Sequence, residues 1–310
     1  MDREQAFGVS VTLLSTFCGG LAPIFGKLAY RADVTPYTLV AARTVLAAGI
    51  LWLFYALFWK RYIAIDRANL LGCIGMGIVN GLGSLLYYAG LSRVDASLAQ
   101  LMYGLYPVWV FVFLSAAGHP ISRLAIARLI LAVAGIYFLT HTATASFDLL
   151  GAMLMVAAGA AYGWHLVLGQ WTLADVDPRT MTLYVLTTMA IVVATARLFI
   201  GGPLEPISTD GWVAIVGLAV IPTALARLFL FSGMSRLGGV QASIIGVVEL
   251  IVAVLFAILL LGERLTPMQS IGAGLVVVSM ILIGRETSLE IEDWEAWLFD
   301  ESFPSQSEST

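Results

Sequence analysis

The sequence predicts an all-α membrane protein of ten transmembrane helices, arranged as two inverted five-helix repeats. Of its 310 residues, 60% are hydrophobic and 12% are charged, whereas about 25% are charged in an ordinary soluble domain. The apolar residues form long runs, and a helix needs about 20 such residues to span a bilayer. Short motifs at the ends of these runs occur twice along the chain, which indicates a duplicated unit.

Each predicted helix is an apolar run bounded by charged residues, proline or glycine. In the first half the runs cover residues 7–29, 36–58, 69–91, 95–117 and 122–141. In the second half they cover residues 148–170, 179–200, 211–233, 239–261 and 266–284. The short connections are typical of antiparallel neighbours. Only Met-Asp-Arg-Glu-Gln precedes the first run and no Ala-x-Ala site follows it, so we expect a retained helix and not a cleaved signal peptide.

Lysine and arginine residues in the connections predict the orientation. With a cytoplasmic N-terminus, the residues on the cytoplasmic side are Arg3, Lys60, Arg61, Arg67, Arg123, Arg179, Arg236 and Arg285. Those outside are Arg31, Arg93 and Arg264, with Lys27 and Arg197 near outer helix ends. We therefore expect a multi-pass protein of the cell membrane (plasma or inner membrane) with both termini in the cytoplasm.

The acidic residues are concentrated beyond the last predicted helix. Residues 286–310 hold eight acidic residues and no basic one, so removing them changes the net charge from −4 to +4, because −4 minus −8 is +4. The acidic balance belongs to this tail and gives no sign of a nucleic-acid partner for the rest of the chain. Cys18, Cys73 and three scattered histidines form no disulfide or zinc pattern. We expect no metal and no cofactor.

The repeat is visible in motifs that recur at a nearly constant distance. Ala32–Pro36 (Ala-Asp-Val-Thr-Pro) recurs as Ala174–Pro178 (Ala-Asp-Val-Asp-Pro), 142 residues later, and Gly90–Val94 recurs as Gly233–Leu237, 143 residues later. Because the unit contains five helices, an odd number, the second copy begins on the opposite side of the membrane. We assign residues 1–144 to the first repeat, 145–285 to the second, inverted repeat and 286–310 to a cytoplasmic tail. Inverted repeats of this kind hold a substrate site between them near the midplane.

Residues 261–273 carry the most recognisable motif of the chain. Gly262-Glu263-Arg264-Leu265-Thr266 is followed by Gln269 and by Gly272-Ala273. This resembles the Gly-Glu-x-Leu-Thr…Gln-x-x-Gly-Ala pattern at the start of the last helix in EamA-type members of the drug/metabolite transporter superfamily. Pro107, Arg43 and the turn Ala89-Gly90-Leu91 also match, so the resemblance extends over both predicted repeats.

The resemblance implies a ten-helix transporter of a small organic solute and does not indicate which one. The family includes exporters of amino acids and other metabolites, of drug-like compounds and of nucleotide sugars. Two positions depart from its pattern: Leu250 replaces the proline often found in the ninth helix, and Gly118-His119-Pro120 replaces the usual Gly-Glu of the first half. Glu249 precedes Leu250 where the first half has Tyr106 before Pro107.

Two ionisable residues are predicted deep in the membrane, Arg227 in the eighth helix and Glu249 in the ninth. Such a group is costly unless it is paired or faces a watery cavity. Counted from the shared cytoplasmic connection at about 1.5 Å per residue, Arg227 is about 9 Å deep and Glu249 about 15 Å deep. Two interpretations stay open: the pair senses substrate or a proton, or it is a permanent ion pair that fixes one helix against the other.

The fourth helix carries a second group of candidates. Gln100, Tyr103 and Tyr106 share a face at helical spacing, next to Pro107. Aromatic rings with hydroxyl and amide groups suit a pocket for a flat or amphipathic solute, and helix packing is the alternative for each ring. Pro107 frees a backbone carbonyl, which is tolerated in a membrane where a cavity or a neighbour supplies a partner. Tyr106 and Glu249 are equivalent positions in the two repeats.

Further candidates lie in the second, third and sixth helices. Asn80 is expected mid-membrane in a helix whose glycines permit close packing, while Trp164 and His165 are expected to line the pathway. A lone histidine is more often a hydrogen-bonded core residue, and Arg43 could bind a carboxylate or phosphate or serve the architecture. The predicted substrate-binding residues are Asn80, Gln100, Tyr103, Tyr106, Trp164, His165, Arg227 and Glu249, with no catalytic residue and no metal ligand.

These observations favour a secondary transporter, a permease or exporter that works by alternating access, with an amino-acid-like solute as the first candidate. Protons are a candidate coupling ion, and facilitated diffusion stays open. The chain contains no phosphate-binding Gly-x-x-x-x-Gly-Lys loop, which argues against a self-contained ATP-driven pump. An intramembrane enzyme would need clustered acid, base or metal-binding groups, and we do not expect one. A receptor or scaffold is the other alternative. Two inverted halves argue against it, because such symmetry provides two interconvertible access states that a passive anchor does not need.

Overall fold

The computed structural model describes residues 3–116, 123–141, 148–173, 176–203 and 206–282. The acidic tail and the Gly118–Pro120 motif lie outside these ranges. Up to residue 141 the helices are α1 (Arg3–Gly20), α2 (Ala22–Arg31), α3 (Pro36–Phe58), α4 (Arg67–Leu91), α5 (Ala96–Tyr103), α6 (Tyr106–Ala116) and α7 (Arg123–His141). After it they are α8 (Leu149–Leu173), α9 (Pro178–Ile200), α10 (Thr209–Leu218), α11 (Ala226–Ile245), α12 (Val247–Phe256) and α13 (Pro267–Ile281). Lys60–Tyr62 forms a 3-10 turn, and Ala219–Leu225 and Ala257–Leu261 are π-helical.

All regular structure in the described ranges is helical, and much of it has the length and composition of membrane spans. The six longest apolar stretches are Glu4–Arg31, Pro36–Phe58, Arg67–Leu91, Leu149–Gly169, Pro178–Ile200 and Thr209–Leu237, and the shorter ones are Ile126–Leu139, Val248–Leu261 and Pro267–Ile281. Large apolar side chains face outward: Leu53, Leu198 and Phe199 are 64%, 81% and 84% exposed. Because so apolar a surface is stable in lipid and not in water, the chain is an all-α, multi-pass membrane protein.

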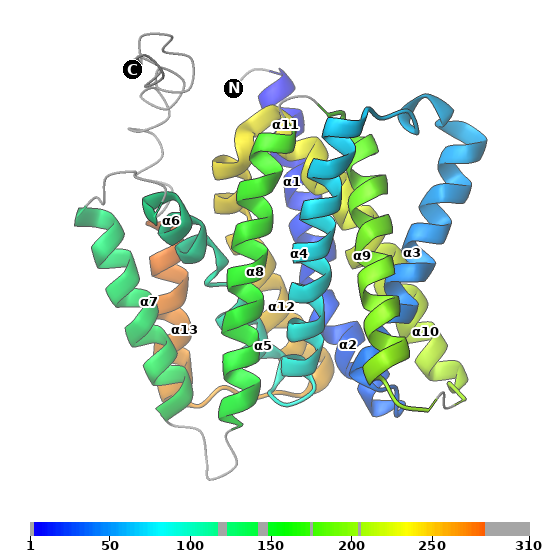
Figure 1. Cartoon of the computed structure of the whole chain (residues 1–310). Coiled ribbons are helices and arrows are strands. Elements are labelled where there is room, and N and C mark those ends of the chain that lie inside the picture. The colour runs from blue at the N-terminus through cyan, green and yellow to red at the C-terminus, as the bar shows by residue number, and fades with distance from the viewer. Residues whose placement is uncertain (1–2, 117–122, 142–147, 174–175, 204–205, 283–310) are drawn as a thin grey trace, which may run out of the picture.

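The helices lie side by side, with the central ones covered at both edges. Figure 1 shows α7 and α13 packed together at one edge and α3 with α10 at the other. Between them α4 contacts α8 and α9, and α1 contacts α11 and α12. Glycines permit several of these contacts; a Cβ on Gly77 of α4 would clash with the side chain of Thr188 in α9. Small residues are the usual means of close helix packing in lipid.

Several of the predicted continuous helices are interrupted, and a proline accounts for three of the interruptions. These three are Leu21 between α1 and α2, residues 104–105 between α5 and α6, and the π-helical segment Ala219–Leu225, and the prolines are Pro23, Pro107 and Pro222. Proline has no N–H, and its ring clashes with the carbonyl four residues earlier. Those carbonyls belong to Gly19, Tyr103 and Leu218, which are the last or next-to-last residues of α1, α5 and α10.

The chain turns back on itself between the eighth and ninth predicted helices. Leu237 lies beside Gly8 near the start of α1, whereas Glu249 lies beside Gly19 near its end, and the long apolar stretch Thr209–Leu237 ends at the same place. Helical hydrogen bonding continues through this turn to Ile245, because each glycine costs only about 1 kcal/mol relative to alanine and keeps its N–H donor. A further break falls at Gly246, inside the predicted helix 239–261.

The motif at residues 262–269 builds the starts of two helices. Gly262 ends the preceding helical turn in the left-handed region, with φ of 73°. The Glu263 carboxylate accepts the backbone N–H groups of Ala96 and Ser97 at 2.7 and 2.8 Å, at the start of α5. Thr266 and Gln269 form a capping box at the start of α13. The motif thus joins the end of the α12 region to the start of α5.

Candidate functional site

An internal cavity of about 100 Å³ lies among α1, α3, α4, α5, α8, α11 and α12. Its polar lining consists of two arginines, one glutamate, one asparagine, two serines and four tyrosines. The charged residues are Arg43, Arg227 and Glu249. Because charged groups are expensive inside a membrane and mark substrate or ion pathways, this cavity is the candidate functional site.

Breaks in the helices surround the cavity. Gly19 and Ala22, on either side of the α1–α2 break, line it, as do Tyr103 at the end of α5 and Pro222 in the π-helical segment. Glu249 lies in the first turn of α12, directly after the break at Gly246. Discontinuous helices of this kind form the substrate sites of many transporters, because their ends expose backbone and side-chain groups to a central space.

His165, which is fully buried in α8, organises one side of the cavity. Its Nδ1 lies 3.2 Å from the backbone carbonyl oxygen of Met76, so Nδ1 carries the proton and donates it. Its Nε2 is then an acceptor, and it lies 3.2 Å from both Asn80 Nδ2 and Arg227 Nη1. A histidine with one donating and one accepting nitrogen is neutral. His165 therefore positions the amide of Asn80 and the guanidinium of Arg227, which both line the cavity.

Glu249 is held by a chain of hydrogen bonds from α4 through α5 to α12. The Tyr87 hydroxyl donates to Gln100 Oε1 at 3.0 Å, and Gln100 Nε2 donates to Glu249 Oε1 at 3.3 Å. Gly19 leaves the space for this carboxylate: a Cβ there would lie 2.9 Å from Glu249 Cδ and 3.0 and 3.1 Å from its two oxygens. No direct ion pair between Arg227 and Glu249 is present in the described chain, so the interpretation as a permanent ion pair is wrong.

Tyrosine rings enclose the space next to Glu249. Tyr103 lies 4.9 Å from Tyr87 and 5.4 Å from Tyr162, centroid to centroid, and Tyr162 lies 5.0 Å from Tyr106. The broken α5–α6 helix comes close to α8 here, since a Cβ on Gly159 would lie 2.9 Å from the Tyr103 carbonyl oxygen. Such a group of rings beside a carboxylate favours cationic groups, which ring faces attract.

Arg43 forms the other charged end of the cavity. Its side chain is 7% exposed, and its Nη1 donates to Thr223 Oγ1 at 2.7 Å while its Nη2 donates to Ser84 Oγ. The guanidinium carbon lies 4.5 Å from the centroid of the Tyr88 ring. All of these partners are neutral.

A smaller cavity of about 30 Å³ adjoins the first one. Both are lined by Ser15, Tyr162, Leu230 and Glu249, and the smaller one continues along Met234, Ala242 and Gly246 of the α11–α12 region. The space beside Glu249 thus continues towards the end of α1 at which the chain begins.

Most of the predicted site residues come together in the structure. Asn80, Tyr103, Arg227 and Glu249 line the main cavity, and Tyr106 lines the smaller one. Gln100 and His165 hold lining residues by hydrogen bonds.

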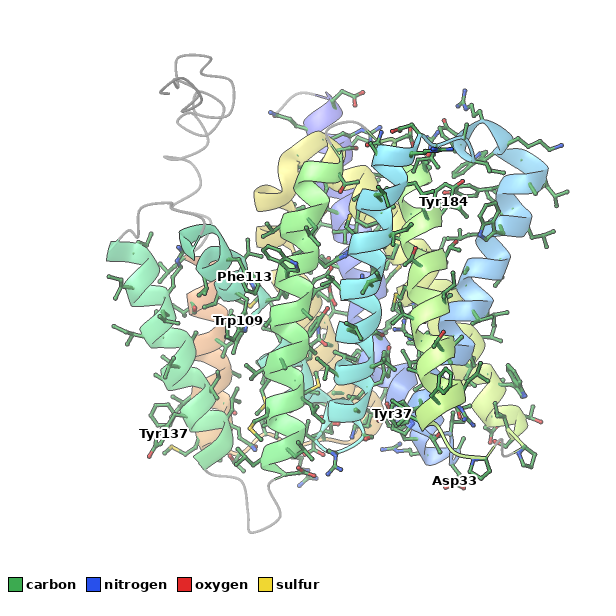
Figure 2. All side chains as sticks on the ribbon, viewed as in Figure 1. Asp33, Tyr37, Trp109, Phe113, Tyr137 and Tyr184 are labelled. Carbon is green, nitrogen blue, oxygen red and sulfur yellow. The ribbon has the colours of Figure 1, made fainter. Side chains whose placement is uncertain are left out.

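Trp164 lies outside both cavities, contrary to our prediction. It is 37% exposed and its ring lies 5.2 Å from Phe113. Figure 2 shows Phe113 and Trp109 beside α8, on the side of the molecule where α7 and α13 lie. Neighbouring residues on a helix point about 100° apart, so Trp164 faces elsewhere when His165 faces the interior.

Several residues of the site were missed by sequence reasoning. Gly19, Ser84, Tyr87 and Thr223 were not singled out, although they shape or contact the charged groups. A hydroxyl or a glycine inside an apolar helix costs little, so no energetic signal marks it. One signal could have indicated Thr223. It directly follows Pro222, which leaves the carbonyl of Leu218 without its usual donor, and the Thr223 hydroxyl supplies that donor.

Fold and site together define a helical membrane protein with a charged, solute-sized interior cavity bordered by broken helices, the design of a transporter. The chain belongs to the EamA-like transporter family, whose model matches residues 6–141 and again residues 149–285. The resemblance in the motif at residues 262–273 is therefore confirmed, and this is a multi-pass membrane transporter.

Two curated relatives and one solved structure are similar to most of the chain. The uncharacterized transporter YcbK of Bacillus subtilis is 26% identical over 297 residues, covering 92% of this chain and 94% of the relative. The threonine/homoserine exporter RhtA of Escherichia coli K12 is 27% identical over 261 residues, covering 81% and 84%. A crystal structure with 14% sequence identity has a TM-score of 0.67 and covers 94% of this chain and 99% of that chain, which supports the fold.

Proposed function

We propose that this transporter is a secondary carrier that moves a small, amino-acid-like solute across the cell membrane by alternating access between two inverted five-helix halves. The observation that carries the proposal is the cavity itself, in which both signs of charge meet at the breaks of four helices. Both termini lie in the cytoplasm in this proposal, and the ten spans are the six long apolar stretches plus α5–α6, α7, α12 with its π-helical segment, and α13.

The helix contacts support the inverted repeat. If residues 1–144 and 145–285 are copies, α4 and α8 are the third helix of one copy and the first of the other. The third helix of the second copy is α11, and the first helix of the first copy is α1. The pair α4 and α8 is in contact, and so is the equivalent pair α11 and α1. Likewise α6 contacts α8, while its counterpart α12 contacts α1. Reciprocal contacts are expected when two copies are related by a pseudo-two-fold axis in the membrane plane.

The size and chemistry of the cavity support a small polar solute. A water-sized sphere takes about 10–15 Å³ in the same measure, so a cavity of about 100 Å³ holds several waters or one small metabolite. Guanidinium groups, a carboxylate, an amide and hydroxyls match the groups of an amino acid. The similarity to a threonine/homoserine exporter makes hydroxylated amino acids the first solutes to examine.

Glu249 is the candidate site for proton coupling in this carrier, with facilitated diffusion as the alternative. The groups around it are Gln100, Arg227, Tyr87, Tyr103, Tyr106 and Tyr162. It is the sole carboxylate that lines the main cavity in the described chain. From there it can bind and release a proton, or bind the ammonium group of a solute.

Transport is tested with the purified protein in liposomes preloaded with unlabelled amino acids. We expect saturable uptake of labelled threonine, homoserine or a related amino acid, competed by the same compound, and none in protein-free liposomes. Equal uptake with and without the protein across the amino-acid panel would overturn the proposed solute class.

The inversion is tested at two equivalent exposed serines. Ser92 and Ser235 lie in the recurring Gly-Leu-Ser-Arg and Gly-Met-Ser-Arg motifs, so inverted copies place them on opposite faces of the membrane. In a background without Cys18 and Cys73, a membrane-impermeant maleimide added to intact cells should label Ser92→Cys and leave Ser235→Cys unlabelled until the cells are opened. Labelling of both from outside would exclude the inverted arrangement.

A further inference from the structure

We infer that Arg43 binds a carboxylate group of the transported solute, so that the site selects solutes with a free carboxylate at one end. The inference rests on the proposed carrier function and names the chemistry at one end of its cavity. Arg43 lines the cavity and is buried, and its two hydrogen-bond partners, Ser84 and Thr223, are neutral hydroxyls.

The guanidinium of Arg43 has hydrogen-bonding capacity that the protein does not use. Of the five N–H groups of an arginine, one donates to Thr223 and one to Ser84, and the buried Nε has no partner in the described chain. No carboxylate within the described ranges forms an ion pair with it. A cation held inside a membrane by neutral groups alone is incompletely compensated. An anionic ligand in the adjoining cavity would supply both the missing charge and the missing acceptors.

Pro222 explains why the Thr223 hydroxyl acts only as a hydrogen-bond acceptor towards Arg43. The proline disrupts the helix and leaves the Leu218 carbonyl without its usual donor. The Thr223 hydroxyl donates to that carbonyl at 2.7 Å, so its proton is used and its lone pairs face Arg43. The arrangement fixes one edge of the planar guanidinium. A fixed guanidinium is suited to bidentate binding of a carboxylate.

Arg197 shows how a buried arginine looks when its role is structural. Its Nε donates to Thr38 Oγ1 at 2.8 Å, and its Nη1 and Nη2 donate to the carbonyl oxygens of Gly202 and Pro203 at 2.8 and 2.9 Å. Each nitrogen of Arg197 has a hydrogen-bond partner, and two of these partners are carbonyl oxygens just beyond the end of α9. Arg197 lines neither cavity. Arg43 lacks this kind of compensation.

The charges of the whole cavity fit a solute that carries both signs. Arg43, Arg227 and an ionised Glu249 leave an excess of one positive charge, so the cavity favours a ligand that brings a carboxylate to Arg43. A zwitterion brings one without changing the net charge, whereas a cation would raise the excess to two. The amino group of the same solute then faces Glu249 and the rings of Tyr87 and Tyr103. A simple organic amine would leave Arg43 unbalanced, so the structure favours zwitterions over cations.

The closing experiment compares an amino acid with its amide and its methyl ester, which keep the amino group and lose the carboxylate. Binding is measured by thermal shift of the purified protein and transport by uptake in liposomes. We expect the acid to bind about ten- to hundredfold more tightly than either derivative, the range for a hydrogen bond to a charged group. Chloride and acetate are added separately, and acetate should compete weakly at the same end.

Variants connect this preference to Arg43. Arg43→Gln should bind the acid and the amide equally, and Arg43→Lys, which keeps the charge and loses the planar fork, should retain part of the preference. Arg197→Lys is the matched control and should keep the full preference. If Arg43→Gln does not fold, the Arg43→Lys comparison decides alone.

The outcomes separate the inference from the proposed function. Wild-type protein that transports the acid and the amide equally well would overturn the inference and leave the carrier intact. Competition by chloride, together with equal binding of acid and amide, would assign Arg43 to an inorganic anion and likewise overturn it. If no amino acid or derivative is transported, the proposed solute class fails instead.

Discussion

The two charged ends of the cavity are built in different ways. At one end Arg43 is fixed by hydroxyl groups and the face of Tyr88, and a guanidinium presents its N–H donors in a planar fork that matches a carboxylate. At the other end Glu249 is held by one amide hydrogen bond, in space that the absence of a side chain at Gly19 creates. A carboxyl group can gain or lose a proton, so the first end suits permanent anchoring and the second suits exchange. The following changes test that division.

The largest effect is expected from filling the space beside Glu249. In Gly19→Val the added atoms would meet the carboxylate, which already lies 2.9–3.1 Å from the position of a Cβ. Overpacking of this kind costs about 1–3 kcal/mol, so we expect transport to fall about tenfold or more while the protein still folds.

Gly49→Ala is the matched control for this change. A Cβ at Gly49 has no neighbouring atom within 4 Å, so this variant should transport normally and melt slightly higher, since alanine restricts the unfolded chain. Normal transport by Gly19→Val would show that the solute does not pass the Glu249 end.

Replacing Glu249 with glutamine tests the exchangeable end directly. Glutamine keeps the volume and can still contact Gln100, and it cannot exchange a proton. With proton coupling, Glu249→Gln should still exchange labelled for unlabelled solute across the membrane, yet fail to accumulate solute when a pH gradient is applied. The two assays are run on the same liposomes, so that a loss of folding, which would abolish both, is recognised. Wild-type accumulation by this variant at every external pH would exclude a coupling role for Glu249.

An intermediate effect is expected from His165, which acts on the cavity through Arg227 and Asn80. His165→Leu removes the acceptor of both donors and leaves them buried without a partner, which costs about 1–3 kcal/mol. We expect a lower melting temperature and weaker solute binding. His165→Gln supplies a carbonyl oxygen in a similar place and should restore part of the binding. Equal loss in both variants would mean that packing, and not the hydrogen bond, is what the site needs.

The sequence was informative about the fold where the physical signal is local. Apolar runs and starts such as Thr35-Pro36 and Thr266-Pro267 predicted helix ends to within a few residues, because capping involves neighbours along the chain. The interruption at residues 104–105 was less accessible. Pro107 indicates a weakened helix, and whether the helix bends or breaks depends on the packing of α8 against it.

For the site, the sequence located charges and could not locate their partners. Arg227 and Glu249 stand out because an ionisable residue in an apolar run is unusual. Their pairing with each other was the simplest hypothesis, and it is wrong because α8 is rotated so that His165 meets Arg227, and α5 is rotated so that Gln100 meets Glu249. Such rotations arise from many packing contacts at once, and no single motif reports them.

The smallest effect is expected at Asp148, outside the membrane spans and away from both ends of the cavity. The backbone N–H of Gly151 and the guanidinium of Arg93, at 2.9 and 2.7 Å, lower the pKa of this carboxyl. A lowered pKa stabilises the folded protein above the ordinary aspartate value of about 3.9, and that stabilisation is lost as the pH falls through the lower folded value. Asp148→Asn should therefore melt slightly below the wild type at neutral pH and low salt. The difference should shrink in high salt, which screens exposed pairs, and in acid, while solute binding is unchanged. A binding loss as large as that of His165→Leu would mean that the ends of the helices, and not only the two ends of the cavity, control access to the solute.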